Sequence, residues 1–187
     1  MTRILLSSAA LAALLSACAT PPPPPAPYPE PVAVMQPTLS QAGMDCVLRL
    51  NAANQYEISA AQLALQMSTN PDVRSFAQMM VDQHTAAIAQ VGGALQSINM
   101  NPPPVQLTPD LQTRLDGMRN TGANFDAAYL QDQIAAHQDA LALAQSCAAN
   151  GGPPIASVAA GLVPAIQDHL SRAQALAANL PRPGERG

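Results

Sequence analysis

Proline is gathered at the two ends of this chain, and this distribution limits where regular structure can form. Eleven of the 19 Pro lie between Pro21 and Pro37 or from Pro181 onward. Because proline lacks the backbone N–H that helices and central strands use, the two ends cannot form long regular elements. The stretch between them is rich in Ala, Leu and Gln and is left free to be helical.

The N-terminus is typical of an export signal. Arg3 supplies a positive charge, an apolar run extends from Ile4 to Leu15, and Leu15-Ser-Ala-Cys18 follows it. The apolar run is shorter than the ~20 residues that span a bilayer, which favours a processing segment. The last four residues resemble the bacterial lipobox, in which the cysteine receives diacylglycerol. An ordinary signal cut nearby, with Cys18 left free, is the alternative.

These features predict the organisation of the chain. We expect a signal peptide at residues 1–17, a lipidated Cys18 that attaches the protein to a membrane, and a Pro-rich tether over residues 18–43 in extended polyproline II conformation. Residues 44–180 are expected to fold as one domain, and residues 181–187 to form a disordered tail. Because Ala19 is not the Asp that retains such lipoproteins in the inner membrane, we expect the periplasmic face of the outer membrane.

The central stretch has the apolar spacing of helices. Thr108-Pro109-Asp110 begins a short helix that ends before Gly122, and no stretch alternates as a strand does. Four longer helices are expected at 45–68, 72–98, from about 124 to the Gly151-Gly152 pair, and 155–179. Helices of ~24 residues are ~36 Å long, so the sequence predicts an all-α four-helix bundle.

Charge is scarce in this chain. Only 11% of residues are charged, against roughly a quarter in ordinary globular proteins, and the eight basic residues are all Arg in a chain of net charge −4. Without a basic surface, nucleic acid is excluded as an expected partner. Of the ten acids between Asp45 and Leu180, nine are Asp, which we expect at helix starts or on outer faces. The tenth acid is Glu57, which lies on the apolar face of its helix.

Each long helix places one polar side chain near the middle of its apolar face. These side chains are Glu57, His84, His137 and His169. In an antiparallel bundle the midpoints of all helices share one level, so the four groups are expected to converge. Three imidazoles and a carboxylate suit one transition metal ion such as divalent Zn, Fe, Mn or Cu. A polar core without metal, in which a charged histidine bonds to Glu57, is the alternative.

Three segments resemble a known bacterial family. They are Ser75-Phe-Ala-Gln-Met-Met-Val-Asp-Gln-His84, Phe125-Asp-Ala-Ala-Tyr129 continuing to Gln133 and His137, and Leu162-Val-Pro164 followed by His169-Leu170. The family is catalogued as domain of unknown function four-one-four-two. The resemblance implies a ferritin-like fold in an exported protein with no established activity. The family's recurrent positions correspond to Glu57, His84, Phe125, Asp126, Tyr129, His137, Pro164 and His169. Gln83 departs from the family, which usually has an acid there, and Ile88 stands where Asn is common.

The di-iron pattern of ferritin-like proteins is incomplete in this chain. That pattern uses a Glu from each of two helices and Glu-x-x-His from the other two. Val81 and Ile166 stand three residues before His84 and His169, and the third long helix offers a histidine instead of its Glu. We therefore expect no di-iron centre and no ferroxidase or oxygen-activating chemistry, so the chain is expected to have no catalytic residues.

Two cysteines remain after Cys18. Paired thiols in an exported protein suggest a disulfide between Cys46 and Cys147. In a simple up-down-up-down bundle these residues lie at opposite ends, ~35 Å apart, whereas a disulfide needs Cα atoms within about 7 Å. The bridge therefore requires a long crossover between the second and third long helices, and Asn99 to Ala123 is long enough to supply it.

Two classes of function follow from these observations. The first, which we favour, is a lipid-anchored, non-enzymatic envelope protein whose bundle binds a protein partner or serves the envelope under stress. The second is a metal-binding module that uses Glu57, His84, His137 and His169. Met79 and Met80 precede His84, and thioethers suit Cu(I), although methionine at helical spacing is more often a core residue.

Overall fold

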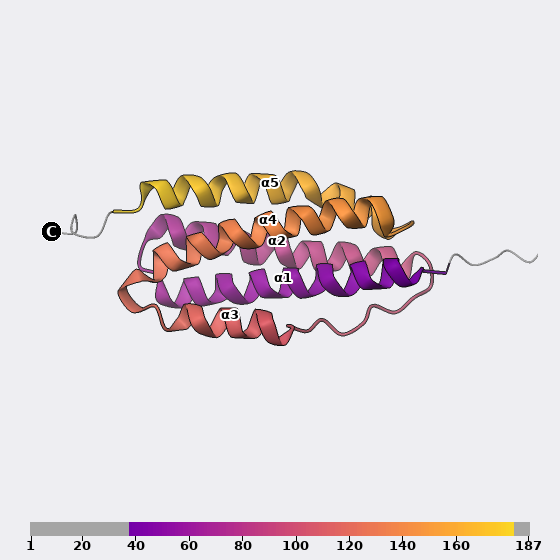
Figure 1. The fold of residues 1–187 in the computed structure, drawn as a ribbon, viewed down its shortest axis with the longest axis horizontal. Helices are drawn as coiled ribbons and strands as arrows, with labels where there is room; N and C mark the ends of the chain where they lie inside the picture. Colours follow the sequence, from indigo (N-terminus) through magenta and orange to yellow (C-terminus); the bar gives the residue numbers. More distant parts are fainter. Residues whose placement is uncertain (1–37, 182–187) are drawn as a thin grey trace, which may run out of the picture. The chain divides into compact units, whose positions relative to one another are not determined.

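The computed structural model describes residues 38–181, and every regular element in this part of the chain is helical (Figure 1). The elements are α1 (Gln41–Met67), α2 (Pro71–Gln96), α3 (Pro109–Arg119), the 3-10 turn η1 (Gly122–Asn124), α4 (Phe125–Asn150) and α5 (Ile155–Asn179). The predicted all-α four-helix bundle is confirmed, with α3 as a short fifth helix. The predicted signal peptide, the lipidation of Cys18 and residues 182–187 of the tail lie outside the described residues. None of the described helices is long and apolar enough to cross a membrane.

Side-chain caps fix where α1, α2 and α3 begin. The Asn70 side chain accepts hydrogen bonds from the backbone N–H groups of Asp72 and Val73, and Pro71 follows it at the first helical position. α1 begins at Gln41, four residues before the predicted start and inside the predicted tether, because Ser40 caps it through the N–H of Gly43. The helix therefore includes residues 41–43, which the nearby proline residues had led us to assign to the tether.

The four long helices form two hairpins joined by a crossover. α1 and α2 pack together, as do α4 and α5, while α1 also packs against α4 and α2 against α5. Between α2 and α4 the chain returns along the length of the bundle through residues 97–124, so that α2 and α4 run in the same direction (Figure 1). This is the predicted long crossover. The ferritin-like label stays a prediction.

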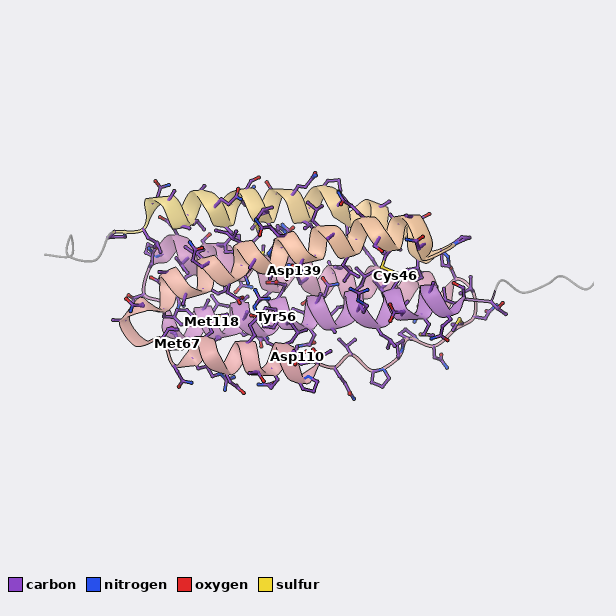
Figure 2. The ribbon with its side chains drawn as sticks, viewed as in Figure 1. Cys46, Tyr56, Met67, Asp110, Met118 and Asp139 are labelled. Carbon is purple, nitrogen blue, oxygen red and sulfur yellow. A yellow bond between two sulfur atoms is a disulfide. The ribbon has the colours of Figure 1, made fainter. Side chains whose placement is uncertain are left out.

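The crossover brings the start of α1 to the end of α4. Cys46 and Cys147 are joined by a disulfide there, with their Cα atoms 5.7 Å apart, which confirms the predicted bridge (Figure 2 labels Cys46). Gly43 permits this close approach, because a Cβ at that position would lie 2.6 Å from the carbonyl oxygen of Gly151. The first turn of α1 is thus held against the last turn of α4.

α3 is attached to the bundle by a partly buried ion pair. The Arg114 guanidinium donates to a side-chain oxygen and to the backbone oxygen of Asp132 on α4, and it lies 5.2 Å from the ring centre of Tyr56 on α1. The Tyr56 hydroxyl donates to the other Asp132 oxygen at 2.6 Å. We expected most Asp residues at helix starts or on outer faces. Asp132 is an exception, because it lies between α1, α3 and α4.

A layer of polar side chains divides the apolar core in two. One cluster surrounds Phe76, Met80 and Tyr129, and the other surrounds Val47 and Leu95. The buried polar residues of the long helices lie between these clusters at the middle of the bundle: Asn51, Asn54, Glu57, His84, Gln133, His137 and His169. This layer contains the predicted site.

Candidate metal centre

Three histidines from three helices meet in the polar layer. His84 on α2, His137 on α4 and His169 on α5 each offer a ring nitrogen, and these three nitrogens all lie within 4.8 Å of one another. All three side chains are buried, and the centres of their rings are 5.2 to 5.6 Å apart. The expectation that mid-length positions converge therefore holds for the histidines.

The outward nitrogen of each ring already has a partner. His84 Nδ1 lies 2.7 Å from Asn54 Oδ1, and the Asn54 amide nitrogen donates to the Leu50 carbonyl, so that the oxygen faces the ring and accepts. His137 Nδ1 donates to the Gln133 carbonyl oxygen at 2.8 Å. His169 Nε2 donates to Gln83 Oε1 at 2.7 Å. These bonds place a proton on the outward nitrogen of each ring.

The inward nitrogens are consequently left with lone pairs. In the neutral rings these are Nε2 of His84, Nε2 of His137 and Nδ1 of His169. His137 Nε2 and His169 Nδ1 face each other at 3.3 Å, where two lone pairs repel unless a proton or a metal ion lies between them. His84 Nε2 is buried and has no hydrogen-bond partner among the described residues. The arrangement is therefore suited to a cation at its centre.

Burial keeps two of the rings neutral. Burial, and then the neighbouring histidines, lower the pKa of His84 well below its ordinary value. Burial, and then His137, lower the pKa of His169 to about 4. At neutral pH these imidazoles hold no second proton, so their inward nitrogens are available as metal ligands, which must be deprotonated.

Glu57 lies beside this group and not within it. Its Oε1 is 3.9 Å from His137 Nδ1, the outward nitrogen, and its Oε2 accepts a hydrogen bond from the Gln133 side chain at 2.7 Å. Burial is the main cause that raises its pKa, which the nearby His137 and the Gln133 hydrogen bond partly oppose. The structure therefore brings three of the four predicted ligands together and places the fourth in the layer that surrounds them.

The residues whose side-chain amides contact the histidines or Glu57 were not predicted as site residues. Asn54 lies three positions before Glu57, and Gln133 lies four before His137, so helical spacing puts each amide on the same face of its helix as a predicted site residue. That spacing was the available signal. Gln83 had been noted only as a departure near His84, whereas its amide bonds to His169 on another helix. No pattern within one helix could show that contact.

The remaining polar and sulfur-containing candidates have other positions. Asp82 and Asp168 are exposed, as their spacing from the histidines predicted, and Asp168 pairs with Arg172. Met80 is fully buried within an apolar cluster, which favours its interpretation as a core residue. We expected Tyr129 to be a packing residue with its hydroxyl at the rim, but the whole side chain is buried and the hydroxyl has no hydrogen-bond partner among the described residues.

Replacing Asn54 by Leu tests the role of the amide. Without an acceptor at Nδ1, the His84 proton can move to Nε2 and occupy the inward position. We expect metal affinity to fall by about 10–100-fold, the usual effect of losing such a partner. Competition titrations against a chromophoric chelator would measure this fall. Asn150→Leu, on an exposed amide of α4, is the control and should bind as the unchanged protein does. Equal affinities in the two variants would contradict the assignment.

The fold and its buried three-histidine centre define a class of helical-bundle protein with a candidate mononuclear metal site. A family model described as domain of unknown function (DUF4142) matches residues 29–176. The chain belongs to this family, as the resemblance in its sequence implied. No curated protein sequence matches the chain.

Solved structures share the fold. The crystal structure of a DUF305 fragment from Deinococcus radiodurans has a TM-score of 0.67 at 16% identity, covering 77% of this chain and 100% of that one. CopM in the Cu(I)-bound form has a TM-score of 0.60 at 17% identity, covering 73% of this chain and 96% of that one. CopM in the Ag-bound form gives 0.58 at 18% identity, over 79% and 100%. At these identities the likeness concerns the fold.

Proposed function

We propose that this protein binds one Cu(I) ion through the inward nitrogens of His84, His137 and His169. The observation that carries the proposal is the set of hydrogen bonds on the opposite nitrogens, which leaves a lone pair on one ring nitrogen of each of three histidines whose ligand atoms lie within 4.8 Å of one another. Three nitrogens around one metal at bonds of about 2 Å would lie ~3.5 Å apart. The 3.3 Å between His137 Nε2 and His169 Nδ1 is close to that value.

Charge and burial favour copper in its monovalent state. The three ligands are neutral, the site is buried, and the cost of moving an ion out of water rises steeply with its charge. Imidazole is a good ligand for copper, which also binds such sites more tightly than the other divalent first-row metals when it is oxidised. CopM, which shares the fold, has structures in Cu(I)-bound, Cu(II)-bound and Ag-bound forms, which agrees with copper as the metal. Binding, and not turnover, is the role we propose.

Titration of Cu(I) under anaerobic conditions tests the proposal. Protein purified without a histidine tag should bind one Cu(I) per chain, and His137→Leu should lower the affinity by at least about 100-fold, since it removes one of three ligands. Met80→Leu is the control, because it exchanges a buried thioether for an apolar side chain of similar size. It should retain copper. Stoichiometric binding by His137→Leu, or no binding by the unchanged protein, would overturn the site.

We also propose that the copper-binding bundle is held at the periplasmic face of the outer membrane by a lipid on Cys18. The lipobox-like Leu15-Ser-Ala-Cys18 and the Pro-rich residues that follow support this proposal. Cys18→Ser should abolish incorporation of labelled palmitate and release the protein from sedimented membranes. Copper stoichiometry should be unchanged in the released protein. Label incorporated into the Ser variant would contradict the proposal.

A further inference from the structure

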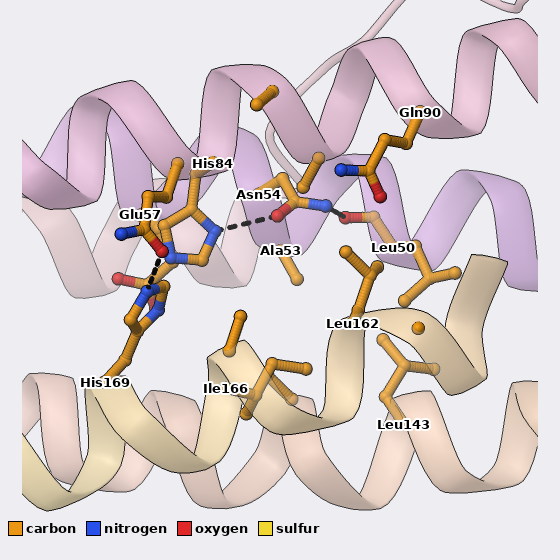
Figure 3. A pocket seen from close by; sticks show the side chains of 16 residues that line it. Leu50, Ala53, Asn54, Glu57, His84, Gln90, Leu143, Leu162, Ile166 and His169 are labelled. Carbon is orange, nitrogen blue, oxygen red and sulfur yellow. Dashed lines mark hydrogen bonds between the residues drawn. The ribbon is translucent and has the colours of Figure 1, made fainter.

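A cavity lies beside the three histidines. It has a volume of ≈190 Å³ and is enclosed by the four long helices (Figure 3). Leu50 and Ala53 of α1, Leu143 of α4, and Leu162 and Ile166 of α5 supply much of its wall, and His84 and His169 lie at one end. An apolar cavity of about 150 Å³ in another protein binds benzene, so this one can hold a small organic molecule.

The cavity opens to solvent between two helices. Its exposed apolar lining positions are Ala86 on α2 and Gly161 and Ala165 on α5. These small residues leave the opening free, and a Cβ added to Gly161 would meet no other atom within 4 Å. The exposed side of the cavity therefore lies between α2 and α5.

The lining limits the chemistry of the ligand. No Arg lies on the cavity wall, which instead includes the Glu57 carboxyl group and the side-chain amides of Asn54, Gln83 and Gln90, so an anion would find no positive charge there. At the histidine end, His84 Nε2 is buried with no hydrogen-bond partner among the described residues, whereas the Glu57 carboxyl already accepts from the Gln133 amide. A suitable occupant is neutral, with an apolar body and one atom that bonds toward the histidines.

We propose that this cavity binds a small neutral organic molecule with a single soft donor atom, such as a thioether, which completes the coordination of the metal. The inference rests on the proposed Cu(I) site. Three protein ligands leave a position open for an exogenous ligand, and soft donors suit Cu(I). The cavity begins at two of the three histidines, so a molecule within it can direct its donor to that position.

Infrared spectroscopy of the Cu(I)-loaded full chain tests the inference. The probe is tert-butyl isocyanide, a neutral soft donor on a compact aliphatic body, whose N≡C stretch changes frequency when the carbon bonds to copper. We expect a shifted band that saturates at one equivalent per copper. Filling the cavity with Gly161→Leu should weaken isocyanide binding by at least about tenfold, equivalent to losing the burial of roughly two methylene groups. Copper stoichiometry should not change.

Gly117→Leu is a matched control. Gly117 is exposed on α3, outside the cavity, and a Cβ there would also meet nothing within 4 Å. This variant should bind the probe as the unchanged protein does, and Ala165→Leu should repeat the effect of Gly161→Leu. Circular dichroism melting curves would establish that all variants fold. If copper binds and the two glycine variants bind isocyanide equally, the cavity is not the binding site and this inference is overturned. If copper does not bind, the proposed function fails as well.

Discussion

Removal of the disulfide by the double change Cys46→Ala and Cys147→Ala is expected to lower the free energy of unfolding by about 4 kcal/mol. The bridge joins residues 101 positions apart. A loop of that length loses roughly 4.7 kcal/mol worth of entropy when it is closed in the unfolded chain. The bridge also holds the first turn of α1 against the last turn of α4, so we expect the bundle to open first at that end. Urea unfolding monitored by circular dichroism would measure the change.

Reduction of the unchanged protein supplies the control for the disulfide. With the bond reduced by dithiothreitol, its stability should approach that of the double variant, which itself should not respond to the reductant. The copper site lies in the middle of the bundle, so the double variant should still bind one Cu(I) when folded. A loss of less than about 1 kcal/mol in the double variant would contradict the expected contribution of a loop this long.

Replacing Glu57 by Gln is expected to stabilise the metal-free protein at neutral and alkaline pH. Burial raises the pKa of Glu57 above its ordinary value, so the folded state holds a proton that the unfolded state has already released. The free energy of unfolding contributed by Glu57 is therefore fully present below pH ~4.5 and is lost as pH rises through the raised pKa. Glutamine fits the same space, can accept the Gln133 hydrogen bond and has no charge to bury. Because an ionised buried group can cost several kcal/mol, this gain should be among the largest of any single substitution.

Measurement of unfolding in urea with EDTA, from pH 4 to pH 8, would test this expectation. The two proteins should be similar in stability near pH 4 and diverge as pH rises. His84 and His169, whose pKa values are lowered, act in the opposite direction in both proteins. Because the pKa of His169 is lowered to about 4, the unfolded state binds more protons between pH ~4 and ~6.5, so stability increases with pH across that window. The difference between the two proteins isolates the carboxyl group. A constant difference at every pH would show that Glu57 keeps its ordinary pKa.

Helix boundaries could be predicted closely where a cap or a breaker stands in the sequence. α5 begins and ends at the predicted residues, and α2 begins at Pro71, directly after the capping Asn70. The start of α1 was placed too late because Ser40 lies among residues whose composition suggested a spacer. Its capping bond to Gly43 depends only on local geometry. Ser40 could therefore have been recognised as a helix cap, but the nearby proline residues favoured a spacer instead.

The convergence of the histidines could be predicted from their positions along the helices, each of which is near the middle. Antiparallel helices of similar length share a level at their midpoints, and this brought His84, His137 and His169 together. The position of Glu57 could not be predicted in this way. Glu57 is also near the middle of its helix, but the direction of its side chain depends on which neighbour donates to it. The Gln133 amide donates to the carboxylate, which therefore lies beside Nδ1 of His137, the nitrogen that faces away from the other two histidines.

The sequence by itself determined the helices, the crossover that a disulfide requires, and the level at which polar groups gather. These follow from apolar spacing, proline, capping residues and helix length, which are properties of neighbouring positions in the chain. Only the tertiary structure decided which ring nitrogen of each histidine faces the centre. The choice is made by the hydrogen-bond acceptors that lie around the outside of the three-histidine group. Two of these acceptors come from other helices: Asn54, which bonds to His84, and Gln83, which bonds to His169. Such contacts join residues 30 and 86 positions apart, and their distances and directions arise only when the helices pack.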